Sequence, residues 1–476
     1  MSVLGRRVFT ASAWFSGAFV LTKAISFVRL AIMARLLSQD QFGLLAIIVL
    51  VVASLWALSD AGIEAAVVQK QDPSERWLYT AWQMNWMRGV LLALICWLAA
   101  YPVSVFFHQP ELSMLLSWAA LIPLIQGFTS LGYPLLQKTL NFKKRVWVDL
   151  SKEGVFTLVA VTMAIWWHAD VTALLFGLLA GTIASVTVSF AVHGFRPKMV
   201  FDFQAARQIW GFGKHLLGAG VLIFLMTNLD DAVVGRLLGM EQLGQYTMAF
   251  MLAGIITSQL VQLLNSVLFP AMSTMQDDVV RLQRILSFTL RLVVGLLTPI
   301  TLLALLVPDL LVHVALGEQW LVIVPVFLIL MAMGWMRGVA TVFGPAILAL
   351  GHSGAMHRIK WIEFTLFSIC IVPAVMTFGI EGAALTLLLV YAMSLVLHVR
   401  TVGLLLGSIR PVIKEGLKGA FPSIIAFAAV GGWSLVALPT YSGELFLVGM
   451  FISIWGVIFF IKEKFFLLML WAMRNA

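Results

Sequence analysis

The feature that most constrains this chain is a series of long segments that are apolar on every face. Leu44 to Leu58 and Val293 to Val307 are two of them. About 20 such residues cross a bilayer as a helix. Hydrophobic residues make up 61% of the chain and charged residues only 11%, against roughly 25% in soluble proteins. The sequence therefore predicts an all-α membrane protein and excludes a soluble one.

Turn residues and charge clusters divide the apolar chain into about fourteen candidate transmembrane helices. We expect them near 10–36, 41–69, 78–107, 112–137, 146–167, 170–194, 208–238, 241–272, 281–307, 320–350, 356–378, 380–406, 417–438 and 443–461. Pro134 and Pro345 fall within the fourth and tenth of these helices. We expect both helices to be kinked, because neighbouring helices can satisfy the backbone groups that a kink frees.

Basic residues predict the direction of the helices. Every second connection carries lysine or arginine, and together these connections hold 21 of the 31 basic residues. Such a bias over short loops marks the cytoplasmic side. We therefore expect a multi-pass protein with both termini in the cytoplasm. The formal net charge of +9 is better explained by anionic lipid headgroups than by nucleic acid.

The short connections and the cysteines argue against an enzyme. No connection is long enough to hold a soluble catalytic domain, and no loop carries a cluster of carboxylates. Cys96 and Cys370 both lie in apolar segments, where we expect small buried side chains rather than a disulfide or a metal site. No metal or cofactor is expected.

A short segment occurs twice in the chain. Residues 35–43 and 236–244 lie 201 positions apart and are identical at five of nine positions. Each copy joins one predicted helix to the next on the predicted outer side. The match implies two six-helix lobes related by a pseudo-two-fold axis along the membrane normal, a repeat found in transporters. We expect lobes at 1–200 and 201–410, followed by a terminal helix pair and short tail at 411–476.

Several short strings occur in a characteristic order. They are Ala34-Arg35-Leu36-Leu37 with Phe42-Gly43, Ser59-Asp60-Ala61-Gly62-Ile63, Asn228-Leu229-Asp230-Asp231, Gly235-Arg236-Leu237-Leu238-Gly239, Leu243-Gly244-Gln245-Tyr246, Leu268-Phe269-Pro270-Ala271-Met272 and Leu316-Gly317-Glu318-Gln319-Trp320. On these strings the chain resembles the oligosaccharide flippases, or polysaccharide transporters, of the superfamily that also contains multidrug exporters and lipid II flippases.

The resemblance implies a function in the inner membrane. It implies export of a lipid-linked oligosaccharide, carried on an isoprenoid pyrophosphate, from the cytoplasmic to the outer leaflet through a cavity lined by the first, second, seventh and eighth helices. Membrane lipids and the polysaccharide polymerase machinery are the expected partners. Three alternatives stay open: a cation-coupled multidrug exporter, a membrane glycosyltransferase or polymerase, and a non-transporting scaffold of an envelope assembly complex.

Ten basic residues remain after the 21 at the cytoplasmic connections are counted. They are Lys23, Arg29, Arg35, Arg88, Lys152, Lys214, Arg236, Arg291, Arg337 and Arg400. A cation at mid-membrane costs at least about 2.5 kcal/mol unless it meets water or an acid. A cavity lined by cations would suit a pyrophosphate. Lys23, Arg29, Arg88 and Arg291 are our candidate substrate contacts, and structural pairing is the alternative for Lys23 and Arg29.

Acidic residues offer partners for these cations. Asp60 and Glu64 are four apart and share a helix face in the second helix, at about the depth of Arg88, so an Asp60–Arg88 pair is the alternative to substrate contact. In the second lobe, the position that matches Asp60 is uncharged, so Arg291 lacks the analogous partner. Glu363 lies at similar depth and can neutralise it. Local pairing is expected where Lys152 and Glu153 lie close to Asp149 in one helix.

Two further acids suggest gating or ion coupling. Asp230 matches Arg29 under the 201-residue offset, and Asp231 follows it. A pair between Arg29 and Asp230 would close the outer side of the cavity, and a fold-stabilising role for Asp230 is the alternative. Asp60, Glu64, Asp230 and Asp231 keep coupling to protons or sodium open, since buried carboxylates can titrate near neutrality.

Overall fold

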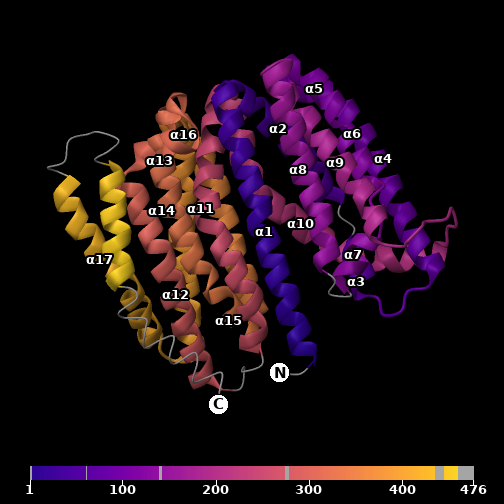
Figure 1. Ribbon diagram of the computed structural model, residues 1–476. Helices are drawn as coiled ribbons and strands as arrows, with labels where there is room; N and C mark the ends of the chain where they lie inside the picture. The colour runs from indigo at the N-terminus through magenta and orange to yellow at the C-terminus, as the bar shows by residue number, and fades with distance from the viewer. Residues whose placement is uncertain (1–2, 60–61, 139–141, 274–277, 435–443, 459–476) are drawn as a thin grey trace. The chain divides into compact units, whose positions relative to one another are not determined.

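The computed structural model describes residues 3–59, 62–138, 142–273, 278–434 and 444–458, and every element in these ranges is helical (Figure 1). The chain divides into two compact units, Met1–Thr247 and Met248–Ala476. Six of the described helices are long and apolar enough to cross a membrane, and one bent pair makes a seventh if it is a single span. The chain is a multi-pass membrane protein; the count of fourteen spans and the six-helix lobes remain predictions.

The described residues of unit 1 form ten helices and the start of an eleventh. They are α1 (Val3–Leu36), α2 (Gln39–Ser59), α3 (Ile63–Gln69), α4 (Glu75–Phe106), α5 (Glu111–Ala119), α6 (Leu121–Gly127), α7 (Gly132–Lys138), α8 (Phe142–Trp166), α9 (Val171–Val192), α10 (Phe203–Leu238) and α11 (Met240–Ser273). Polar caps fix several of these starts. The side chains of Ser74, Asp170 and Asp202 accept hydrogen bonds from the first free backbone N–H groups of α4, α9 and α10, as helix N-caps do.

Small residues bring α8 and α9 of unit 1 close together. A Cβ atom on Gly177 would lie 2.8 Å from the Cβ of Ala160, and one on Gly181 would lie 2.6 Å from the backbone oxygen of Lys152. The two glycines form a G-x-x-x-G pair, a pattern that lets helix backbones approach closely. In this protein the pair packs α9 against α8 of the same chain.

Prolines divide two of the predicted helices into shorter ones. A proline ring clashes with the carbonyl of the residue four positions earlier. In unit 1, Pro134 therefore disfavours helix at Ser130, in the gap between α6 and α7, where the axis bends by 53°. In unit 2, Pro345 lies four residues after Thr341, the last residue of α14. The expected kink in the fourth helix is confirmed. In the tenth, Val342 separates α14 from α15 but keeps helical φ and ψ, and Glu318–Ala349 counts as one span, so a kink there stays a prediction.

Unit 2 contains the remaining helices. Among the described residues they are the rest of α11, α12 (Val279–Leu306), α13 (Pro308–Ala315), the 3₁₀ helix η1 (Glu318–Ile323), α14 (Val324–Thr341), α15 (Phe343–Ala349), α16 (Ser353–Leu406), α17 (Arg410–Ser434) and the helix Glu444–Ile458. Within α16, Gly379 has a φ of 62° and a non-helical ψ, which is open to glycine. This kink separates the two helices predicted at 356–378 and 380–406, and we refer to them as the first and second arms of α16.

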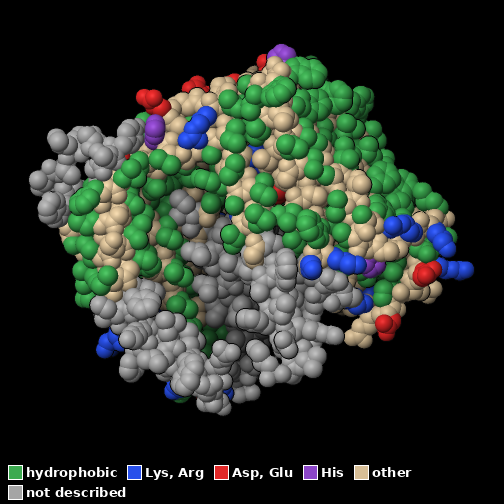
Figure 2. Space-filling model, viewed as in Figure 1, with side chains coloured by type: hydrophobic (Ala, Val, Ile, Leu, Met, Phe, Trp, Pro, Cys, Tyr) green, Lys and Arg blue, Asp and Glu red, His purple; other side chains and the backbone are tan. Residues whose placement is uncertain are grey.

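The surface matches a membrane environment. Figure 2 shows hydrophobic side chains over most of the described surface in that view, and lysine and arginine side chains gather where unit 1 carries α3 and α7. Large apolar side chains face outward from the long helices, among them Trp97, Leu158, Met376 and Leu404. Contiguous exposed apolar surface of this kind is expected where lipid replaces water. Cys96 is buried and Cys370 half-buried, and both are free thiols.

Candidate functional site

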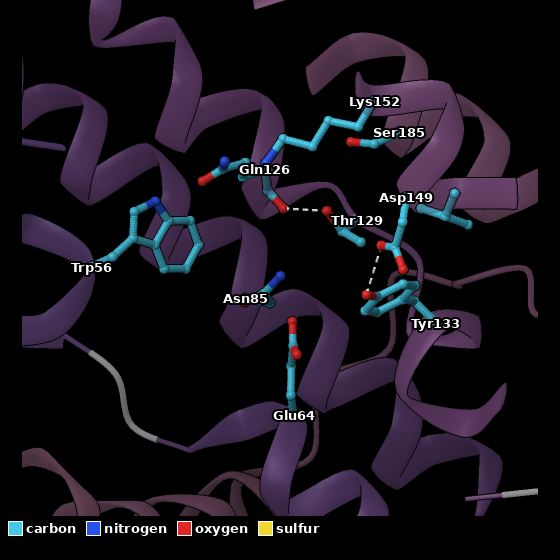
Figure 3. A pocket seen from close by; sticks show the side chains of 10 residues that line it. Trp56, Glu64, Asn85, Gln126, Thr129, Tyr133, Asp149, Lys152 and Ser185 are labelled. Carbon is cyan, nitrogen blue, oxygen red and sulfur yellow. Dashed lines mark hydrogen bonds between the residues drawn. The ribbon is translucent and has the colours of Figure 1, made fainter. Parts of the chain in front are cut away.

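A cavity of about 290 Å³ lies inside unit 1 (Figure 3). Its walls come from α2, α3, α4, α6, α7, α8 and α9 and from the segment between α6 and α7. The lining residues are Trp56, Glu64, Asn85, Gln126, Thr129, Tyr133, Val148, Asp149, Lys152 and Ser185. Nine of these ten side chains carry a polar atom, so the cavity is a polar space within a bundle of otherwise apolar helices.

Two interrupted helices build this cavity. The second predicted helix is broken at Gly62, which adopts the left-handed conformation with a φ of 59° before α3 begins. The fourth is broken at residues 128–131, from which Thr129 lines the cavity. Irregular backbone at membrane depth is tolerated where it is buried in protein or lines a cavity. The two helix breaks therefore form part of the cavity wall.

Side chains satisfy the backbone groups that the second break exposes. The Asn85 side-chain amide donates to the carbonyl of Gly127 at 3.0 Å, and the Thr129 hydroxyl donates to the carbonyl of Gln126 at 2.7 Å. The backbone N–H of Ser130 donates to the hydroxyl of Ser189 at 3.1 Å. These bonds hold the break open in a fixed shape, because an unpaired buried carbonyl or N–H group is costly.

The cavity is not cationic. Lys152 is the one basic residue in its lining, and Glu64 and Asp149 are both acidic. The Tyr133 hydroxyl donates to Asp149 Oδ1 at 3.0 Å, and the Arg145 guanidinium lies 4.7 Å from the Tyr133 ring. The buried indole Nε1 of Trp56 has no hydrogen-bond acceptor among the described residues. This lining of amides, hydroxyls, carboxylates and one indole is suited to an uncharged polar ligand.

Arg29 forms a structural ion pair in this conformation. Its guanidinium donates to Glu153 at 2.8 Å and to the Thr157 hydroxyl at 3.1 Å, and it lies 3.7 Å from the Phe156 ring centre. Ser26 also donates to Glu153 at 2.8 Å. The alternative of structural pairing for Arg29 is therefore realised between α1 and α8. The expectation that Glu153 pairs locally is wrong, because its carboxylate faces α1.

The predicted pair between Arg29 and Asp230 is not formed in this conformation. Asp230 is buried on α10 and accepts a hydrogen bond from the Tyr246 hydroxyl on α11 at 2.7 Å. Its other oxygen, Oδ1, has no hydrogen-bond donor among the described residues. Asp231 beside it is half-buried. The contact with Tyr246 agrees with a fold-stabilising role for Asp230.

The residues around the first break lie on separate helices. Asp60 falls outside the described residues, so the predicted Asp60–Arg88 pair remains a prediction. Arg88 donates to the carbonyl of Ser59 at 3.4 Å, and its guanidinium lies 4.2 Å from the ring of the cavity residue Trp56. The expectation that Asp60 and Glu64 share a face of one continuous helix is wrong, because the chain turns at Gly62.

The two remaining candidate cations are not among the residues that line this cavity. Lys23 is exposed on α1. Arg291, in unit 2, lies 3.4 Å from Glu415 of α17. Glu363 is not its partner, since Glu363 accepts hydrogen bonds from Lys360 and Ser394. Among the described residues, no group of three or more histidine, cysteine or acidic side chains is placed to hold a metal ion.

The two copies of the repeated segment touch each other within unit 1. A Cβ atom on Gly43 would lie 1.9 Å from the backbone oxygen of Met240, and one on Gly244 would lie 1.8 Å from that of Gln39. Under the 201-residue offset, Gly43 matches Gly244 and Gln39 matches Met240, so the two contacts are reciprocal. Reciprocal contacts are the pattern that a two-fold axis produces. The Gln245 amide also donates to the Gln39 side chain at 2.6 Å.

Most of the cavity residues were not predicted from the sequence. The predicted site residues are charged, whereas the cavity is lined largely by neutral polar groups such as Asn85, Gln126 and Ser185. Their signal was available in the sequence as isolated amides and hydroxyls within apolar helices. Gly62 and the Thr129-Ser130 pair also marked the two breaks.

Comparison with known proteins agrees with this architecture. The solved structure of the lipid II flippase MurJ in an inward closed conformation superposes with a TM-score of 0.77, covering 95% of this chain and 99% of MurJ at 10% sequence identity. The chain is 28% identical to the lipopolysaccharide biosynthesis protein WzxC of Escherichia coli over 402 residues, covering 83% of this chain and 80% of WzxC. It is 27% identical to the succinoglycan biosynthesis transport protein ExoT of Rhizobium meliloti, covering 70% of this chain and 68% of ExoT.

The helical fold defines a class, the multi-pass membrane proteins that share the fold of MurJ, and the relatives are named as biosynthesis and transport proteins rather than as enzymes. Within that class the particular family also follows. The family of polysaccharide biosynthesis proteins matches residues 32–325, which is more than half of the chain. The chain belongs to this family.

Proposed function

We propose that the protein moves a lipid-linked oligosaccharide, carried on an isoprenoid pyrophosphate, from the cytoplasmic to the outer leaflet of the inner membrane. Its family supports a role in polysaccharide biosynthesis, and one relative is named a transport protein. The observation that carries the proposal is the cavity of unit 1. This cavity is a polar space built from two broken helices, and it offers sugar groups hydrogen-bonding partners that the apolar bundle otherwise lacks.

The lining of the unit 1 cavity suits sugar hydroxyls. Glu64 and Asp149 can accept hydrogen bonds from hydroxyls, and the side-chain amides of Asn85 and Gln126 can donate or accept. The Trp56 indole offers an apolar face for a sugar ring and an N–H donor without an acceptor among the described residues. We therefore assign the oligosaccharide, rather than its pyrophosphate, to this cavity.

The pyrophosphate needs positive charge, and Lys23, Arg29, Arg88 and Arg291 remain the proposed contacts. Arg88 has the most support, because its guanidinium packs on Trp56 at the cavity wall. Arg29 and Arg291 would first have to leave Glu153 and Glu415. A guanidinium can exchange a carboxylate for a phosphate because both accept two parallel hydrogen bonds.

Transport would proceed by alternating access between the two predicted lobes, with both termini in the cytoplasm. With the cytoplasm negative, export of an anionic headgroup gains about 2.3 kcal/mol per charge per 100 mV. The membrane potential alone can therefore drive the flux. Glu64, Asp230 and Asp231, together with Asp60, remain the proposed sites for coupling to protons or sodium.

A cation-coupled multidrug exporter is the second candidate. The observation in its favour is the lining of the cavity, where Glu64 and Asp149 outnumber Lys152. An acidic cavity suits cationic drugs. The family assignment favours the glycan substrate.

Gene inactivation separates these candidates. We expect a strain without the protein to accumulate one isoprenoid-pyrophosphate-linked oligosaccharide in the inner leaflet and to lose the matching surface polysaccharide. Complementation with Trp56→Ala should fail, whereas Trp97→Ala, which alters a lipid-facing tryptophan on α4, should restore the polysaccharide. Unchanged glycans together with increased drug sensitivity would instead support the exporter.

A further inference from the structure

A second cavity, of about 310 Å³, lies inside unit 2 between α14, α15 and the two arms of α16. Its lining residues are Arg337, Ala340, Thr341, Gly344, Pro345, Leu348, Met356, Lys360, Tyr391, Ser394 and His398. Much of this wall is apolar, yet two basic side chains reach it. The cavity therefore combines a hydrocarbon-like surface with positive charge.

The charge of Lys360 is already balanced. Its ammonium lies 2.8 Å from the carboxylate of Glu363, which is fully buried. The Ser394 hydroxyl donates to the other oxygen of that carboxylate at 2.5 Å, and His398 Nδ1 lies 2.8 Å from the backbone oxygen of Ser394. Lys360, Glu363 and the second arm of α16 thus form a satisfied network with no net charge when His398 is neutral.

The charge of Arg337 is not balanced. Its guanidinium lies 5.6 Å from the centre of the Tyr391 ring, and no carboxylate among the described residues lies within ion-pair distance of it. Arg29 and Arg291, by contrast, each have an acidic partner. A cation–π contact offsets only part of the cost of removing a guanidinium from water. Arg337 therefore leaves one positive charge for an anion that enters the cavity.

We infer that this cavity binds the phosphate group of an anionic phospholipid, with Arg337 as its main ligand, Lys360 as a second contact, and part of an acyl chain on the apolar wall. An arginine fork can donate two parallel hydrogen bonds to a phosphate. Ala340, Pro345, Leu348 and Met356 offer the surface that hydrocarbon prefers. A free anion would gain nothing from these apolar groups.

The unit 2 cavity lies close in sequence to a predicted membrane surface, as a lipid headgroup site requires. Lys360 and Met356 lie in the first turns of α16, next to a connection that the basic residues predict to be cytoplasmic. Anionic lipids are enriched in that leaflet and attract basic groups at its surface. The site lies in unit 2 and is separate from the cavity of unit 1, so this inference does not depend on the proposed transport function.

The test measures lipid binding to the full-length protein. The purified protein is stripped of lipid in detergent, and phosphatidylglycerol and the zwitterionic phosphatidylcholine are titrated and followed by native mass spectrometry. We expect one saturable site that prefers phosphatidylglycerol. Arg337→Ala should weaken binding about ten-fold, the effect of losing one charge-assisted hydrogen bond. Arg337→Gln, which keeps donors but loses the charge, should also weaken it.

Arg400→Ala is the matched control, because Arg400 is an exposed arginine of unit 2 that does not line the cavity. It should bind like the wild type. The lipid-free melting temperature of each variant reports whether it has folded, and Arg337→Gln replaces Arg337→Ala if the alanine variant does not fold.

Four results would overturn the inference, and the first three concern the variants, the headgroup and free phosphate. They are equal weakening by Arg337→Ala and Arg400→Ala, absence of a preference for phosphatidylglycerol, and displacement of the lipid by inorganic phosphate at equal concentration, which would show a free-anion site. A stronger preference for an isoprenoid phosphate over phosphatidylglycerol would also contradict it, because the cavity would then bind the carrier of the substrate.

Discussion

The two cavities differ in how their charge is balanced, and this difference separates two kinds of ligand. In unit 1, acids and one lysine share a wall of amides and hydroxyls, and Arg29 nearby is held by Glu153. In unit 2, the wall is largely apolar and Arg337 has no acidic partner among the described residues. A polar, nearly neutral space suits a sugar, and an apolar space with one uncompensated cation suits a lipid phosphate.

Filling each cavity with the same side chain should give the sharpest contrast. Ser185 and Thr341 are half-buried hydroxyl residues, one in each cavity, and each hydroxyl donates to the backbone three residues earlier. We expect Ser185→Trp to reduce transport by about 100-fold, because it removes the space for the oligosaccharide, and Thr341→Trp to reduce transport less than about three-fold. A flux assay in vesicles measures both.

Lipid binding should respond in the opposite order. Thr341→Trp should abolish binding of phosphatidylglycerol, whereas Ser185→Trp should leave it intact. If both variants lose both activities to the same extent, the distinction between the two cavities is wrong and a general folding defect explains the loss.

The next largest effect should come from the contact between the two repeat copies, which lies within unit 1. An alanine at Gly43 or Gly244 would place its Cβ within 1.9 Å of a backbone oxygen, so α2 and α11 must separate. We expect either substitution to lower transport by at least about ten-fold, since a backbone cannot yield as a flexible side chain does. Gly254→Ala is the control on α11, because nothing lies within 4 Å of its added Cβ. Normal flux in Gly43→Ala would show that this contact has no role in the transport cycle.

Arg29, which has an acidic partner, should contribute more to stability than Arg337, which has none among the described residues. Arg29→Ala leaves the half-buried Glu153 without its partner, and we expect a loss of about 1–3 kcal/mol in the free energy of unfolding. Arg29→Ala with Glu153→Ala should lose less than the sum of the two single variants. Arg337→Ala should cost less than about 0.5 kcal/mol in lipid-free detergent. An equal loss in both alanine variants would remove the contrast between structural and ligand-binding arginines.

The smallest effect concerns Arg291. Its 3.4 Å pair with Glu415 is partly exposed, and we expect a coupling energy of at most about 1 kcal/mol in a double-mutant cycle. The cycle of Arg291 with Glu363 should give no coupling, because Glu363 is engaged with Lys360 and Ser394. Coupling to Glu363 rather than Glu415 would reverse this assignment.

The sequence predicted the helices far better than it predicted the contacts between them. Apolar length and polar caps such as Asp170 and Asp202 set where helices run, and Pro134 marked a kink. The break at Gly62 was missed, because a left-handed glycine does not interrupt the hydropathy. Partners were wrong for Glu153 and Glu363, because depth along a helix does not say which way a side chain points.

The repeated segment allowed a spatial relation to be predicted from the sequence. Residues 35–43 and 236–244 were matched by sequence alone, and their reciprocal contact at Gly43 and Gly244 agrees with a two-fold relation. The cavity had no such pattern. Asn85, Gln126 and Tyr133 reach it from different helices, and only the packing of those helices brings them together.

The central claim is that the protein carries an oligosaccharide on an isoprenoid pyrophosphate through the cavity of unit 1. The most direct test reconstitutes the purified protein in vesicles that hold a labelled isoprenoid-pyrophosphate oligosaccharide and measures its transfer between leaflets under an imposed membrane potential. We predict transfer that accelerates with the potential, fails in Trp56→Ala and persists in Trp97→Ala. Transfer no faster than in protein-free vesicles, or equal loss in both tryptophan variants, would contradict the account.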